Sequence, residues 1–199
     1  MARDRASRPE ARSLRLFAAF EVPDVAQDAI DEAIGSLRER FPAARWVPRE
    51  NRHVTLTFPG QTWPRLRGWV EEQVAAVASS TPPIPTRLTS IGAFPGGRRA
   101  RVVWAGVDDA DGRLAGLAGG LDEALAEEFP PESRPYAAHC TVARSDPPLH
   151  LDEGDLDATL RPVAFTVGRV VLFRSHLRRP APRYEPIAVF PLRAPSGRG

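Results

Sequence analysis

The feature that most constrains this 199-residue chain is a pattern of segments that occurs twice. In each half, a strand-like segment is followed by a helix-like segment and then by a strand-like segment that opens with His-x-Thr. The two motifs are His53–Thr55 and His139–Thr141. Arg15 opens the first strand-like segment 38 residues before His53, and Arg101 opens its counterpart 38 residues before His139. This equal spacing predicts two related lobes in one chain, each supplying one histidine to a cleft between them.

Hydrophobic periodicity and turn residues predict the elements along the chain. Helices are expected from Pro23-Asp24 to the stop at Phe41-Pro42, over about 64–78 and over about 111–129. Strands are expected over 14–20, 53–58, 84–91, 101–107, 139–144, 163–174 and 184–190, the second ended by Pro59-Gly60 and the fifth closed by 145–148. Several strands are adjacent and joined by short turns, which favours antiparallel pairing over a parallel α/β sheet.

The predicted fold is therefore α+β and bilobal, with two pseudo-symmetric lobes that each contain a mainly antiparallel sheet and helices. The active site is expected in the cleft between the lobes. We predict flexible tails at 1–13 and 193–199 around a single domain that spans 14–192.

Composition excludes several classes of protein. No apolar run approaches the roughly 18 residues that a membrane span needs, so we expect no membrane association. The polar, Arg-rich segment 1–13 lacks the apolar stretch of a signal peptide. The single cysteine, Cys140, permits no intrachain disulfide, which indicates a cytoplasmic protein without a cysteine-based zinc site. All 27 basic residues are arginine, which suits phosphate contact but can equally reflect compositional bias.

The motifs suit phosphate chemistry because residues i and i+2 of a strand point to the same face. His53 and Thr55 should project together, as should His139 and Thr141. In each pair the hydroxyl can bind a phosphate oxygen while the imidazole transfers a proton. Two such pairs on opposite sides of a phosphorus supply an acid and a base for in-line displacement. Arg144, just after the second motif, can stabilise the developing negative charge.

The same residues allow other interpretations. A single His-x-Thr strand is usually structural, but two in equivalent positions favour a functional site. A metal site on His53 and His139 would need a third ligand, and none lies at ligand spacing, so we expect no metal and no cofactor. Alternation points Cys140 into the core, and His150 and His176 are expected at the surface. Phe58 could stack on a nucleobase, but we favour a core position.

Two His-x-Thr-x motifs in one chain resemble the 2H phosphoesterase superfamily. The flanking sequences are similar to those of its RNA 2′,3′-cyclic phosphodiesterase branch, historically called 2′-5′ RNA ligase, over 16–20, 45–48, 94–104, 139–144 and 172–192. The similarity extends from about Leu14 to Leu192. The chain departs from the family pattern at Cys140, where an aliphatic residue is usual, and at 58–60, where Phe-Pro-Gly replaces Phe-Leu-Gly.

The resemblance implies metal-independent hydrolysis of a terminal 2′,3′-cyclic phosphodiester of RNA, or of a small cyclic nucleotide, to a 2′-phosphomonoester. It implies that His53 is the proton donor to the departing 3′ oxygen and that His139 is the proton acceptor that activates water. Thr55, Thr141 and Arg144 would bind the phosphate. Two alternatives stay open: 2′-5′ ligation by the reverse reaction, and non-catalytic binding of nucleotides or RNA ends. We expect a monomer.

Overall fold

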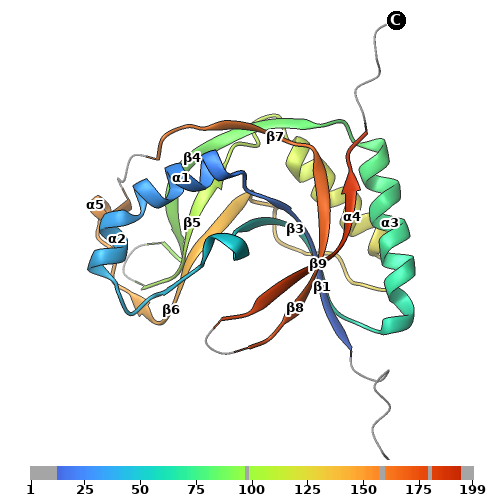
Figure 1. Cartoon of the computed structure of the whole chain (residues 1–199), viewed down its shortest axis with the longest axis horizontal. Helices are drawn as coiled ribbons and strands as arrows, with labels where there is room; N and C mark the ends of the chain where they lie inside the picture. The colour runs from blue at the N-terminus through green and yellow to red at the C-terminus, as the bar shows by residue number, and fades with distance from the viewer. Residues whose placement is uncertain (1–12, 97–98, 157–159, 179–180, 194–199) are drawn as a thin grey trace, which may run out of the picture.

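The computed structural model describes residues 13–96, 99–156, 160–178 and 181–193, which form a curved sheet flanked by helices (Figure 1). Every strand pairing in these residues is antiparallel. The strands are β1 (Leu14–Glu21), β2 (Arg45–Trp46), β3 (His53–Thr62), β4 (Ile84–Phe94), β5 (Ala100–Val107), β6 (His139–Leu149), β7 (Ala164–Val167), β8 (Arg169–His176) and β9 (Arg183–Pro191). The predicted α+β class with antiparallel pairing is confirmed.

The strand order places the two motif-bearing strands at the centre of the sheet. It runs β7-β4-β5-β6-β3-β1-β8-β9, and the short β2 also pairs with β6. Two consecutive helices lie between β1 and β3 in one half, and one helix lies between β5 and β6 in the other half. Both halves thus contain an antiparallel strand pair whose second strand opens with His-x-Thr. This order is compatible with a duplicated unit, and the division into two pseudo-symmetric lobes stays a prediction.

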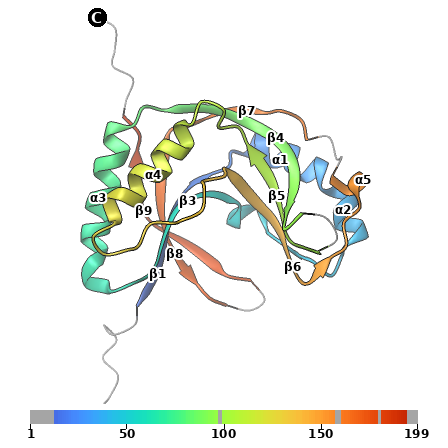
Figure 2. The same cartoon turned by 180° about the vertical axis from the view of Figure 1, so that it is seen from behind.

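The helices cover the sheet at its two ends (Figure 2). They are α1 (Asp24–Ala33), α2 (Gly35–Arg40), α3 (Arg67–Ser80), α4 (Arg113–Leu125) and the short α5 (Glu153–Leu156). Helices α3 and α4 pack against each other beside β3. Their buried apolar side chains, among them Val70, Val74, Leu114 and Leu121, join the main core.

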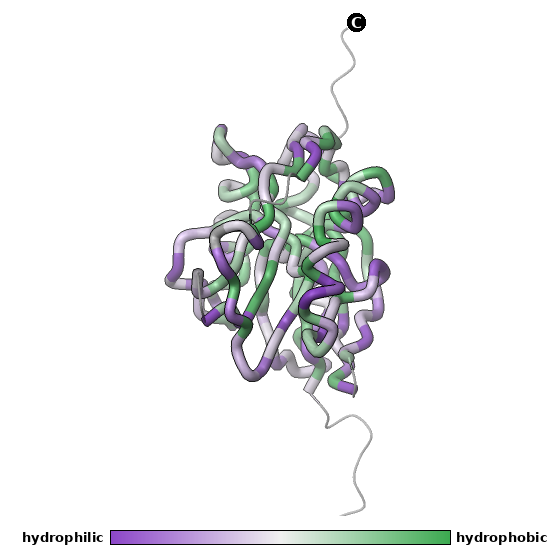
Figure 3. The backbone as a smooth tube through the Cα atoms, turned by 90° about the vertical axis from the view of Figure 1, so that its left-hand side faces the viewer, coloured by the Kyte–Doolittle hydropathy of each residue, from purple (hydrophilic) through white to green (hydrophobic). Residues whose placement is uncertain are grey.

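Alternation along β1 shows how the sheet separates two clusters of side chains. Leu16, Ala18 and Phe20 belong to the main core with the helices. Phe17 and Ala19 point to the other face and form a second cluster with Val171 and Phe173, against which Tyr184 packs. The tube in Figure 3, coloured by hydropathy, shows hydrophobic stretches (green) that pass through the body of the molecule between hydrophilic ones (purple). The second cluster matters for function because it lies on the face of His53.

Several predicted boundaries are wrong. The expected first helix is interrupted at Ile34 and forms α1 and α2. Strands β3 and β6 do not end at their proline-containing segments but continue to Thr62 and Leu149. The strand expected over 163–174 is divided into β7 and β8 at Gly168.

Helix α4 starts at Arg113, two residues after the predicted position, because the Asp109 carboxylate caps its N-terminus. This carboxylate accepts hydrogen bonds from the backbone N–H groups of Leu114 (2.7 Å) and Ala115 (2.8 Å). Phe58 was expected in the core, but its side chain is 48% exposed. The predicted tails 1–13 and 193–199 lie outside the described residues except for Ser13 and Arg193.

Candidate active site

The two motifs lie side by side across the central strand pair. Strands β3 and β6 are antiparallel, with Val54 opposite Cys140. This register places Thr55 opposite His139 and His53 opposite Thr141. Val54 and Cys140 are fully buried on the core face, so the four motif side chains project from the other face. The predicted grouping of two histidines and two threonines is therefore present, within a single sheet.

Each histidine is held in the same way by its own chain. The Nδ1 of His53 lies 2.8 Å from the carbonyl oxygen of Asn51, and the Nδ1 of His139 lies 2.7 Å from that of Ala137. A carbonyl can only accept a hydrogen bond, so Nδ1 carries the proton in both rings. The Nε2 atoms are then left free to exchange a proton with a ligand.

Aromatic rings surround both imidazoles but enclose His53 more. The ring of His53 lies 4.8 Å from that of Phe17 and 5.1 Å, edge-on, from that of Tyr184. His139 has the ring of Phe94 edge-on at 5.3 Å. The pKa of His53 is lowered to about 4, mainly by burial; the hydrogen bond to the Asn51 carbonyl acts in the opposite direction, and the charges of Arg144 and of His139, when His139 is protonated, add to the lowering. His53 is consequently neutral at pH 7 in the free protein.

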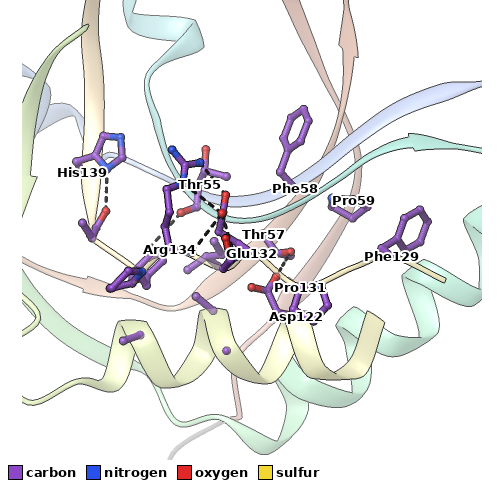
Figure 4. Close-up of a pocket in the computed structure, with 18 of the residues that line it drawn as sticks. Thr55, Thr57, Phe58, Pro59, Asp122, Phe129, Pro131, Glu132, Arg134 and His139 are labelled. Atoms are coloured by element: carbon purple, nitrogen blue, oxygen red, sulfur yellow. Dashed lines mark hydrogen bonds and ion pairs between the residues drawn. The ribbon is translucent and has the colours of Figure 1, made fainter. Parts of the chain in front are cut away.

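Four of the five predicted site residues line an open cavity of about 1140 Å³, part of which is shown in Figure 4. Thr55, His139, Thr141 and Arg144 line it, together with part of α4 and the segment 129–137. The fifth, His53, lines a different cavity of about 480 Å³, together with residues of β1, β8 and the 3-10 turn before β3. The β3–β6 pairing thus brings the four motif residues together, while His53 faces a different cavity from the other predicted site residues.

A network of ion pairs that the sequence did not reveal lies on the chain segment directly before His53. Asp31 on α1 accepts hydrogen bonds from Arg52 (2.5 Å) and Arg49 (2.6 Å). Arg49 and Asn51 are the first and last residues of a 3-10 turn (Arg49–Asn51), and Arg52 follows it. The carbonyl of Asn51 is the one that binds Nδ1 of His53. The side chain of Arg52 is only 1% exposed, so its charge depends on Asp31. Arg and Asp 21 residues apart carry no sequence signal that would have indicated this contact.

A second support holds the strand of the first motif. The hydroxyl of Tyr136, in the segment before β6, donates a hydrogen bond to the backbone carbonyl of Thr55 at 3.1 Å. Two residues further along the strand, the Thr57 hydroxyl donates to the carboxylate of Asp122 on α4. These contacts connect the first motif to the second half of the chain.

In the described part of the chain, no group of three or more His, Cys, Asp or Glu side chains is arranged to hold a metal ion.

Histidines 150 and 176 were expected at the surface. His150 is exposed, whereas His176 is half-buried and its Nε2 lies 2.7 Å from the Glu185 carboxylate. The thiol of Cys140 is buried, and burial raises its pKa to about 12, as expected for a core residue. None of the described helices has the length and apolar character required to cross a membrane.

Comparison with known proteins assigns the family. The model of the 2′-5′ RNA ligase superfamily matches residues 26–179. The chain belongs to this superfamily. An RNA 2′,3′-cyclic phosphodiesterase of Geobacillus stearothermophilus is 33% identical over 92% of this chain, which spans only 59% of that protein. One of Methanothermobacter thermautotrophicus is 30% identical, over 90% of this chain and 99% of that protein.

Solved structures of the superfamily fold share the same architecture. The crystal structure of TT0787 from Thermus thermophilus superposes with a TM-score of 0.75 at 25% identity, covering 90% of this chain and 98% of that one. The predicted α+β class with an antiparallel sheet and the resemblance to the 2H phosphoesterases are thus confirmed.

Proposed function

We propose that this protein is a phosphodiesterase that hydrolyses the terminal 2′,3′-cyclic phosphodiester of RNA to a 2′-phosphomonoester. The observation that carries the proposal is the pair of histidines on one face, each with Nδ1 bound to a backbone carbonyl and Nε2 free. A pure binding site needs no such matched pair of proton-transfer groups. The relatives named RNA 2′,3′-cyclic phosphodiesterase support this substrate class.

In the proposed reaction, the neutral His139 accepts a proton from water through Nε2 as the water oxygen attacks phosphorus. The bond from phosphorus to the 3′ oxygen breaks, and this oxygen takes a proton from Nε2 of protonated His53. The products are a 3′-hydroxyl and a 2′-phosphate, and the two histidines return to their starting states by proton exchange with solvent. Thr55, Thr141 and Arg144 bind the phosphate oxygens on which negative charge accumulates.

This assignment requires His53 to gain a proton when substrate binds, because burial holds it neutral in the free protein. The substrate phosphate is an anion, and an adjacent negative charge favours the protonated imidazole. Substrate binding therefore raises the pKa of His53 and charges the proton donor where it is needed. The pH dependence of kcat, which reports the complex, should differ from that of kcat/KM, which reports the free enzyme.

The proposal also covers the oligomeric state, the location and the cofactor requirement of the enzyme, and the reverse reaction. We propose a monomeric, cytoplasmic enzyme whose residues 14–192 act as one unit, without a metal or cofactor because the histidines supply both acid and base. Ligation of RNA ends by the reverse reaction uses the same groups and requires a 5′-hydroxyl end in place of water. Hydrolysis dominates where water is in large excess.

The test is hydrolysis of a short RNA that ends in a 2′,3′-cyclic phosphate, in excess EDTA. The wild type should yield a 2′-phosphate, and His53→Ala and His139→Ala should each lose activity by a factor of about 10² or more. His150→Ala is the matched control and should retain full activity, since His150 is exposed and lines neither cavity. An inert wild type that still binds a 2′-phosphonucleotide would support non-catalytic binding, and inhibition by EDTA would contradict the metal-free mechanism.

A further inference from the structure

An irregularity in β3 turns Phe58 toward the catalytic face. The pairing of β1 with β3 shifts twice, so that Ala19 lies opposite Thr55, Ala18 opposite Thr57 and Leu16 opposite Gly60. These shifts insert extra residues into β3 and interrupt its alternation. Thr57 consequently points to α4, and Phe58 points to the side of Phe17, whose ring lies 6.2 Å away and nearly parallel. Bulges beside active sites commonly redirect a side chain in this way.

The side chain of Arg15 lies over the aromatic ring of Phe58. The guanidinium of Arg15 lies 4.8 Å from the centre of the Phe58 ring, within the range of a cation–π contact. Many arginines of this chain pair with carboxylates, for example Arg52 and Arg169. No ion pair between Arg15 and a carboxylate occurs in the described residues, so its charge remains available to an anion. An arginine held on an aromatic ring is oriented without being neutralised.

Tyr184 links this arginine to the catalytic centre. Its ring stands edge-on to both His53 (5.1 Å) and Phe17 (5.0 Å). Burial raises the pKa of Tyr184, while the charges of Arg144 and Arg15 both act in the opposite direction. Tyr184 therefore lies within electrostatic reach of the two arginines. A phosphate held by Arg144 and a second anion held by Arg15 would both lie near Tyr184.

We propose that Arg15, Phe58 and Tyr184 form a second subsite, which binds the internucleotide phosphate and nucleoside that precede the terminal cyclic phosphate. Arg15 contacts the phosphate, and the exposed part of Phe58 contacts the base or ribose. The substrate is then an oligoribonucleotide end, and a mononucleoside cyclic phosphate leaves the subsite empty. This inference rests on the proposed function, because it assigns a substrate class to the same site.

The experiment compares kcat/KM for three substrates: adenosine 2′,3′-cyclic phosphate, its 5′-phosphorylated form, and the dinucleotide ApA with a terminal 2′,3′-cyclic phosphate. The wild type should favour the two phosphate-bearing substrates by about tenfold or more, the usual size of a charge-assisted hydrogen bond. Arg15→Gln should remove this preference and leave the rate on the mononucleoside unchanged. For the dinucleotide, the slope of log(kcat/KM) against log[salt] should be smaller in magnitude by about 0.7 in Arg15→Gln than in the wild type, which is the value for the loss of one phosphate contact on a single strand.

Two further variants separate the subsite from general effects. Phe58→Leu keeps an apolar side chain but removes the ring under Arg15, so it should raise KM for the dinucleotide several-fold with little change in kcat. Arg183→Gln is the matched control, because it removes the same charge one residue from Tyr184 on β9, where alternation points it to the other face. It should preserve the wild-type preference.

The outcomes distinguish this inference from the proposed function. Hydrolysis of all three substrates with equal kcat/KM would overturn the subsite alone, as would an Arg15→Gln variant that slows all three equally, since that indicates a structural role. If no substrate is hydrolysed, the proposed function fails, and binding then tests the subsite. Wild type should still bind ApA 2′-phosphate more tightly than adenosine 2′-phosphate, and Arg15→Gln should not; equal binding by the wild type would overturn the subsite.

Discussion

Replacing Asp31 with asparagine should destabilise the protein and slow its reaction, although Asp31 contacts neither histidine. The Asp31 carboxylate accepts hydrogen bonds from Arg52 and Arg49. Arg49 begins the 3-10 turn that ends at Asn51, and Arg52 follows that turn directly. The Asn51 carbonyl fixes Nδ1 of His53. Asparagine keeps the size and one oxygen of the side chain but removes its charge. Asp31 is thus predicted to be a positioning residue for His53.

The structure allows the cost to be estimated. The side chain of Arg52 is 1% exposed, and among the residues that the structure describes one of its terminal nitrogens has no partner, so the Asp31 carboxylate is the main compensation for its buried charge. Removing one partner of a buried pair typically costs about 3–5 kcal/mol. Asp31 itself is 24% exposed, so water screens part of the interaction and we expect about 2 kcal/mol. For a domain of this size that corresponds to a fall of about 4–8 °C in Tm.

Thermal unfolding measures the loss of stability, and steady-state kinetics at about 25 °C measure the slower reaction. We expect kcat to fall about tenfold with KM little changed, because a small displacement of a catalytic group is costly in the transition state. The pH profile of kcat should also shift, which a purely structural loss would not produce. Asp28→Asn is the matched control: in the described part of the chain Asp28 pairs only with exposed Arg49, it is itself 62% exposed, and its loss should change Tm by less than about 2 °C. If Asp31→Asn melts within about 1 °C of the wild type with an unchanged pH profile, the positioning argument is wrong.

Three further results are expected. In NMR titrations His53 of the free protein should titrate near pH 4, and saturation with adenosine 2′-phosphate should move the midpoint upward; a free-state midpoint near 6.5 would contradict the burial argument. Because the unfolded chain takes up this proton near pH 6.5 and the folded chain near pH 4, the free energy of unfolding should decrease as pH falls through this window, and His53→Gln should lessen the decrease. Gly92→Ala should destabilise the protein by about 1–3 kcal/mol because its Cβ would lie 2.2 Å from the Trp104 ring, whereas Gly116→Ala on α4 has open space and should be neutral or stabilising; equal Tm values for the two variants would refute the packing argument.

Alternation explains why much of the site could be predicted. His53 and Thr55, or His139 and Thr141, share a face in any extended strand, and Val54 and Cys140 then face the core. The structure has both motif pairs in these orientations. The same rule failed at Phe58, because the bulges in β3 break the alternation that the prediction assumed.

The sequence by itself determined that the chain is an α+β protein with two equivalent His-x-Thr strands and that their side chains suit phosphate chemistry. These properties depend on local periodicity and on the order of segments. The tertiary structure decided that β3 and β6 are neighbours, that Asp31 pairs with Arg52 beside His53, and that His53 is surrounded by more aromatic rings than His139. Such properties depend on contacts between residues far apart in the chain, which local patterns do not encode, and on the removal of water that only the packed structure produces.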